Sequence, residues 1–194
     1  MSTNTTKNYH HGDLQATLLA TAMRMLERGE EFSLRAVARK AGVSQTAPYR
    51  HYADRAALES ALAAQGFRDL KADLLGDNKA PMSVARLGDF AVAYVAFALR
   101  RPTLFRLMFG NKCDDTNDER VRATAELHTL LAVALARVFP DADAPALATA
   151  AWGLVHGLAF LHLDGKLAAG NPAETSARVR GALMAILSVG AKGR

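Results

Sequence analysis

The segment from Ser33 to Arg55 contains side chains whose chemistry suits contact with a nucleic acid. Gln45 and Thr46 carry amide and hydroxyl groups of the kind that hydrogen-bond to base edges. Tyr49 and Arg50 carry a phenol and a guanidinium, which commonly bind backbone phosphates. Five basic residues and one acidic residue give this segment a charge of +4, out of +5 for the whole chain. By itself the charge leaves two alternatives, a polyanion-binding element and an ordinary solvated helix face.

The spacing of capping, glycine and apolar residues in this segment predicts a helix-turn-helix. Ser33 and Ser44 can each cap a short helix, the first reaching about residue 40 and the second about residue 52. Gly42 lies in the turn between them, where glycine adopts a positive φ at little cost. A plain helical hairpin is the alternative, but the charge, the caps and the turn together favour the helix-turn-helix. Three apolar residues would pack its two helices together: Val37, Ala38 and Val43.

Apolar residues recur at helical spacing along the whole chain, which predicts an all-α fold of about nine helices. The chain has 194 residues, of which 50% are hydrophobic and 22% charged, as is typical of a soluble globular protein. Asp13 and Asp54 are expected to cap two of the longer helices. Outside the helix-turn-helix, the predicted helices span 13–28 and 54–75, include 87–98, span 103–109, include 127–138, and span 145–167 and 172–191.

These elements divide the chain into four predicted regions. A turn-rich stretch before Pro81 marks the main boundary, because Gly, Asp and Asn there favour a loop. The predicted regions are a flexible tail over 1–9, a helix-turn-helix domain over 10–56 with its motif at about 34–53, a connecting helix and linker over 57–80, and a C-terminal domain over 81–194.

Large apolar and aromatic residues cluster in the C-terminal region. Such clusters are more often core than ligand cavity, and both readings stay open here. Trp152 and His156 lie four residues apart on one helix face, where they either pack in the core or contact a ligand. The cluster consists of Phe90, Tyr94, Phe97, Phe105, Met108 and Phe109.

The stretch from Ala144 to Leu163 has no charged residue over a length that could cross a membrane. Pro145 and the acidic residues that flank the stretch argue against a membrane span. We therefore expect a helix that is buried on several sides and suited to a subunit interface.

The sequence lacks the patterns of an enzyme or a metal site. It has no nucleophile elbow, P-loop or dinucleotide-binding glycine motif, and its histidines lack metal-ligand spacing. We expect no cofactor. Cys113 is the single cysteine and is more often incidental than a redox sensor. The N-terminal residues lack the apolar stretch of a secretory signal, so a cytoplasmic location is expected.

Residues 32–58, FSLRAVARKAGVSQTAPYRHYADRAAL, resemble the DNA-binding domain of the tetracycline-repressor-like (TetR) family of bacterial transcriptional regulators. AAWGLVHG at 150–157 resembles the tryptophan-histidine-glycine (WHG) C-terminal domain of one branch of that family, and YHHGDL near the start also resembles that branch. Two residues depart from the common pattern: Arg55 replaces a usual lysine and Pro48 a common leucine. Because Pro48 removes a backbone donor and restrains Ala47, we expect a short, stiff recognition helix.

The resemblance implies three sets of functional residues. The DNA contacts would come from Arg35, Ser44, Gln45, Thr46, Ala47, Tyr49, Arg50, His51 and Arg55. A cavity for an apolar or aromatic effector would involve Phe90, Tyr94, Phe105, Met108, Trp152 and His156. The last two helices would form a homodimer interface through Leu154, Leu158, Leu161, Val179, Leu183, Ile186 and Leu187.

The implied function is that of a cytoplasmic, homodimeric, non-enzymatic regulator, most often a repressor, that a small molecule releases from a palindromic double-stranded DNA operator. Two alternatives stay open. One is an architectural DNA-binding protein without an effector. The other is a small-molecule binding module or enzyme without a DNA function.

Overall fold

The computed structural model describes residues 11–31, 33–76, 83–110, 119–168 and 170–191. Within these ranges the chain forms eight α-helices, one 3₁₀ helix and no strand, which confirms the predicted all-α class. In chain order the helices are α1 (His11–Glu27), α2 (Leu34–Ala41), η1 (Ala47–Arg50), α3 (Arg55–Leu75), α4 (Val84–Arg100), α5 (Pro102–Gly110), α6 (Glu119–Val138), α7 (Ala144–Leu163) and α8 (Pro172–Ala191).

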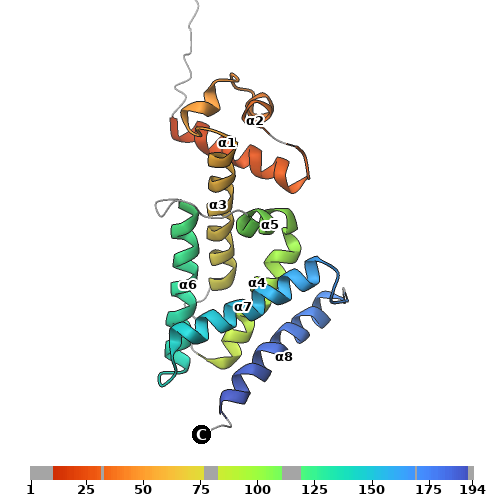
Figure 1. The fold of residues 1–194 in the computed structure, drawn as a ribbon. Helices are drawn as coiled ribbons and strands as arrows, with labels where there is room; N and C mark the ends of the chain where they lie inside the picture. The colour runs from red at the N-terminus through yellow and green to blue at the C-terminus, as the bar shows by residue number, and fades with distance from the viewer. Residues whose placement is uncertain (1–10, 32, 77–82, 111–118, 169, 192–194) are drawn as a thin grey trace, which may run out of the picture.

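Helix α3 joins the two ends of the molecule (Figure 1). At one end α2 packs against α1 and η1. From there α3 runs into the remaining helices, where it packs against α4, α5 and α6. Helix α4 in turn packs against α7 and α8. A displacement of α3 would therefore move the end that carries α2 and η1.

Side-chain caps begin α2 and α3 where the sequence predicts them. Ser33 Oγ accepts a hydrogen bond from the backbone N–H of Ala36 at 3.2 Å. Asp54 Oδ1 accepts one from the N–H of Ala57 at 2.8 Å. At the end of α2, Gly42 adopts a φ of +71°, the left-handed conformation that favours glycine. The predicted caps at Ser33 and Asp54 are thus confirmed.

Two predicted helix boundaries are wrong. Helix α1 begins at His11, so Asp13 lies inside it rather than at its N-cap; the first turn tolerates weak helix formers because its N–H groups need no intrahelical acceptor. Helix α7 ends at Leu163 instead of Leu167, because the chain turns at Gly165 with a φ of +65°. Some predicted features lie outside the described residues: the 1–9 tail, the 77–80 linker and the loop with Cys113.

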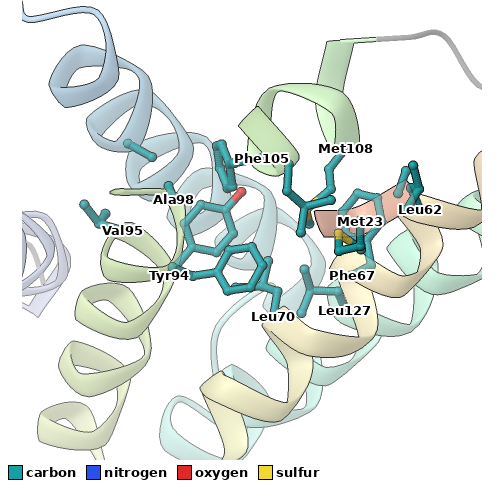
Figure 2. Close-up of a cluster of buried hydrophobic side chains, with 14 of the residues drawn as sticks. Met23, Leu62, Phe67, Leu70, Tyr94, Val95, Ala98, Phe105, Met108 and Leu127 are labelled. Carbon is teal, nitrogen blue, oxygen red and sulfur yellow. The ribbon is translucent and has the colours of Figure 1, made fainter. Parts of the chain in front are cut away.

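One continuous hydrophobic core links the two ends of the molecule, and Figure 2 shows a part of it. Phe67 and Leu70 of α3 lie in it beside Tyr94 of α4 and Phe105 of α5, all of them at most 4% exposed. Met23 of α1 also belongs to this cluster. Since α1 shares its core with α3, α4 and α5, the helix-turn-helix end is packed against the rest of the chain rather than tethered by a linker alone.

Among the described residues, α7 is the one helix long and apolar enough to cross a membrane by length and composition. It packs against α4, α6 and α8. Only 17% of its most apolar window is buried within the chain, so the prediction of a helix buried on several sides is wrong for a single chain. Leu161, which is 43% exposed, lies on the uncovered side.

Candidate functional site

The turn after α2 leads into a 3₁₀ helix rather than the predicted α-helix. Ser44 does not cap it: η1 begins after Thr46, and Ser44 Oγ lies 3.3 Å from Thr46 Oγ1. Pro48 lies in the first turn of η1, where a residue without an N–H loses no intrahelical hydrogen bond. The N–H groups of His51 and Tyr52 both donate to the Pro48 carbonyl at 2.9 Å. The element is short, as expected, but the α-helix capped by Ser44 is a wrong prediction.

Pro48 and Tyr52 are buried and hold η1 against the rest of the end domain. Their burial leaves the neighbouring Tyr49 48% exposed. The predicted DNA-contacting residues therefore lie together at one end of the molecule, although their contact with DNA stays a prediction. Seven are exposed, namely Arg35, Ser44, Gln45, Thr46, Tyr49, Arg50 and Arg55, and two are partly buried, Ala47 and His51.

Ion pairs divide the basic residues of this surface into two groups. Lys40 pairs with Glu30, and Arg55 Nε donates to Glu59 Oε1 at 2.7 Å. Within the described residues, no carboxylate lies within ion-pair distance of the other three basic side chains, those of Arg35, Arg39 and Arg50. These three guanidiniums are therefore the cations of this surface best able to bind an external anion.

A narrow cavity of about 50 Å³, partly open to solvent, lies between α4, α6, α7 and α8, with one residue from α3. Its lining is almost entirely aliphatic or aromatic, which suits a small apolar ligand. The lining residues are Leu74, Leu87, Phe90, Ala91, Tyr94, Leu127, His128, Leu130, Leu131, Leu135, Ala151, Trp152, Val155, Leu183 and Leu187.

A chain of three polar side chains borders this cavity. The indole N–H of Trp152 donates to the Tyr94 hydroxyl at 3.2 Å, and this hydroxyl lies 2.9 Å from Nδ1 of His156. Tyr94 can donate to His156 only if the imidazole is neutral with its proton on Nε2. Burial lowers the pKa of His156 and raises that of Tyr94, so both environments favour the uncharged forms.

Three of the six predicted effector residues line the cavity: Phe90, Tyr94 and Trp152. Phe105 and Met108 do not. They are at most 2% exposed and belong to the core, which corrects their assignment. His156 lies behind Tyr94, and its ring centroid is 4.5 Å from that of Phe109. The α6 wall was not predicted; its signal in the sequence was the apolar face of this helix, where His128 stands among leucines.

The predicted dimer residues of α7 and α8 separate into outward and inward sets. Leu161 and Ile186 are 43% and 52% exposed. Val179 and Leu183 are 0% and 4% exposed, so they belong to the core of the chain and cannot form an outer surface. The remaining three predicted residues are partly buried: Leu154, Leu158 and Leu187. A dimer contact through the exposed and partly buried residues stays a prediction.

Among the described residues, no group of three or more His, Cys, Asp or Glu side chains could hold a metal ion.

On α7, a Cβ built at Gly153 or Gly157 would meet no atom within 4 Å, so this side of the helix has room for a close neighbour.

A family model described as the tetracyclin repressor-like C-terminal domain matches residues 87–185, just over half of the chain. The match includes α4, α5, α6, α7 and most of α8, and so covers most of the cavity wall. No curated protein matches the chain.

Solved structures share the fold over nearly the whole chain. A protein of unknown function from Rhodococcus sp. RHA1 is 34% identical, with a TM-score of 0.75, and the match covers 91% of this chain and 96% of that one. A TetR-family transcriptional regulator from Pectobacterium atrosepticum is 21% identical, with a TM-score of 0.66 and coverage of 93% and 95%. A TetR/AcrR-family regulator from Thermobifida fusca is 15% identical, with a TM-score of 0.62 and coverage of 88% and 96%.

The family match, the all-α fold and the helix-turn-helix end agree with one another. They also place the apolar helix α7 among packed helices of a known fold instead of in a membrane. The chain belongs to the tetracycline repressor-like family, and it is a transcriptional regulator rather than an enzyme.

Proposed function

We propose that this regulator is a cytoplasmic homodimer that binds a palindromic DNA operator and releases it when an apolar small molecule enters the cavity. The observation that carries the proposal is the α2–η1 surface, where exposed Gln45 and Thr46 lie among arginines that have no ion-pair partner in the described residues. The working division of the chain is a DNA-binding domain over 10–56, a connecting region over 57–80 and an effector-binding and dimerisation domain over 81–194.

The exposed residues of this surface have separate roles. Arg35 and Arg50 bind phosphates, which sets affinity and register, while Gln45 and Thr46 reach base edges, which sets sequence preference. Arg55 contributes less than its position suggests, because its guanidinium must first leave Glu59, 2.7 Å away.

A dimer provides the DNA-sequence specificity that a single helix-turn-helix lacks. Two-fold proteins place their recognition elements in successive major grooves, ~34 Å apart, and so read a palindrome. The outward side of α7 and α8 is suited to this contact, because Leu161 and Ile186 are exposed and the side of α7 at Gly153 is open to close approach.

The effect of ligand binding is transmitted through α3, which contacts both the cavity and the helix-turn-helix end of the molecule. Leu74 of α3 lines the cavity. Two ion pairs hold α3 to α6, one of them between Lys71 Nζ and Glu126 Oε2 at 2.8 Å and the other between Arg68 and Glu119. A ligand that separates α4 from α6 therefore pulls on α3. Coupling of about 1–3 kcal/mol would change DNA affinity 5- to 150-fold.

Arg101 forms a second link between the two ends. Its Nε donates to Glu27 of α1 at 2.5 Å and its Nη1 to Asp69 of α3 at 2.6 Å. The end of α4 is thereby tied to the first helix of the DNA-binding domain as well as to the connecting helix. We expect repression as the sign of regulation, with ligand binding freeing the operator.

Selection from a random duplex pool at about 0.15 M salt, a level at which exposed charges are already strongly screened, tests the DNA-binding part without a guess about the operator. We expect an enriched palindrome whose half-sites lie about one helical turn apart. In the selected operator, Gln45→Ala should then alter base preference. Retention only at low salt and without enrichment would instead indicate an architectural DNA-binding protein. No retention at any salt would contradict DNA binding altogether.

A further inference from the structure

The cavity contains almost no polar chemistry that could recognise a ligand. None of its lining residues carries a carboxylate, an ammonium or a guanidinium. Polar side-chain atoms come from only three of them, Tyr94, Trp152 and His128. The Tyr94 hydroxyl and the Trp152 indole are already engaged with each other and with His156.

His128 is the exception. Its ring packs on that of Trp152, with 5.7 Å between centroids, which holds the imidazole at the cavity wall. Within the described part of the chain, no hydrogen bond engages either of its ring nitrogens. A neutral imidazole has one donor and one acceptor nitrogen, so His128 can bind either a hydroxyl or a carbonyl.

The geometry points to an effector that is uncharged and mainly apolar, with one hydroxyl or carbonyl group that hydrogen-bonds to His128. This inference rests on the proposed function, in which the cavity takes the effector. An ionised group placed within the lining would lose its hydration without meeting a counter-charge there, and that loss is costly. A pure hydrocarbon would fit the leucine-rich wall but would make no hydrogen bond to His128. His128 is therefore the specificity-determining residue of the cavity.

Trp152 is the single tryptophan of the chain and lines the cavity, so its fluorescence reports ligand entry directly. The probes are five eight-carbon chains that do not absorb with indole: 1-octanol, 2-octanone, 1-chlorooctane, octanoate and octylammonium. They are titrated at pH 8, where octanoate and octylammonium are both ionised. We expect the affinities of 1-octanol and 2-octanone, each relative to that of 1-chlorooctane, to be about three- to tenfold higher in the parent protein than in a variant without the His128 ring nitrogens, the gain of one hydrogen bond. Both ions should bind more weakly than 1-chlorooctane.

Substitutions at His128 test whether this residue makes the hydrogen bond to 1-octanol and 2-octanone. His128→Phe should lower the affinity of 1-octanol relative to 1-chlorooctane by this factor while keeping 1-chlorooctane binding. His128→Gln, whose amide keeps a donor and an acceptor, should retain part of that relative affinity. The matched control is His162→Phe, since His162 lies on α7 outside the lining and should not alter the ratio. Circular dichroism checks that each variant is folded.

Several outcomes would overturn the inference. They are tight binding of octanoate or octylammonium, an unchanged 1-octanol preference in His128→Phe, and a Trp152 emission that no probe alters. DNA release is measured separately with the selected operator. If 1-octanol binds through His128 but leaves DNA bound, the proposal that the ligand releases DNA is wrong, whereas the proposed uncharged ligand class is kept. If octanoate releases DNA, ligand-induced release is kept and the uncharged ligand class is wrong.

Discussion

Replacing Tyr94 with Phe should lower the free energy of unfolding by about 2 kcal/mol, because it removes one hydroxyl that serves two partners. The Trp152 N–H loses its acceptor and His156 Nδ1 loses its donor. A buried polar group without a partner costs about 1–3 kcal/mol. Both partners are only partly buried, so returning water offsets part of the cost, and we take the lower end of that range for each. The ring itself stays, so packing against Phe105 is kept.

The measurement is equilibrium unfolding in urea at pH 7.5, followed by circular dichroism and by Trp152 emission. Protein concentration is held constant, because dimer dissociation would otherwise contribute to the midpoint. The midpoint should fall while the slope stays unchanged, which separates lost stability from a change in unfolded-state compactness. Tyr49→Phe is the matched control: Tyr49 is 48% exposed, so its variant should stay within about 0.5 kcal/mol of the parent.

Two results would refute this reasoning. A Tyr94→Phe variant within about 0.5 kcal/mol of the parent would mean that water replaces the hydroxyl at no cost, and the polar chain would have no structural role. An equal decrease in the free energy of unfolding for Tyr49→Phe and Tyr94→Phe would show that the effect does not depend on burial of the hydroxyl.

Four further predictions follow from other contacts. Burial lowers the pKa of His156 below 6.5, so the unfolded chain binds a proton at His156 more readily than the folded chain. The free energy of unfolding should therefore be highest above pH 6.5 and fall as the pH drops below it. The same pH dependence in His156→Gln would exclude this residue as the cause. Arg50→Ala should weaken binding to all sequences and reduce the salt slope by about one, as filter binding at several salt concentrations would reveal. Leu161→Glu should sediment as a monomer, whereas the equally exposed Val133→Glu on α6 should stay dimeric; a dimer in both would remove α7 from the interface. Arg101→Met should cost about 1 kcal/mol in urea unfolding, since its ion pairs are partly exposed, and should reduce ligand-induced DNA release; full release would rule out the Arg101 link.

The sequence by itself predicted features whose causes lie within a few residues of one another. Ser33 and Asp54 begin their helices through hydrogen bonds that reach three residues ahead, and Gly42 ends α2 by its own backbone conformation. Pro48 lies in the first turn of the recognition element, which is short as the sequence predicted. The helical period similarly predicts the all-α class, because it repeats within single segments. The family resemblance of the helix-turn-helix rests on the same local spacing.

Only the tertiary structure decided which apolar faces meet and where space is left between them. Phe90 and Phe105 look alike in sequence, yet Phe90 lines the cavity and Phe105 fills the core. Val179 faces inward while Ile186, seven residues later, is half exposed. Helical periodicity identifies an apolar face but cannot say which other helix covers it. The wall that holds His128 arises where α6 crosses α7, and that depends on contacts between residues far apart in the chain.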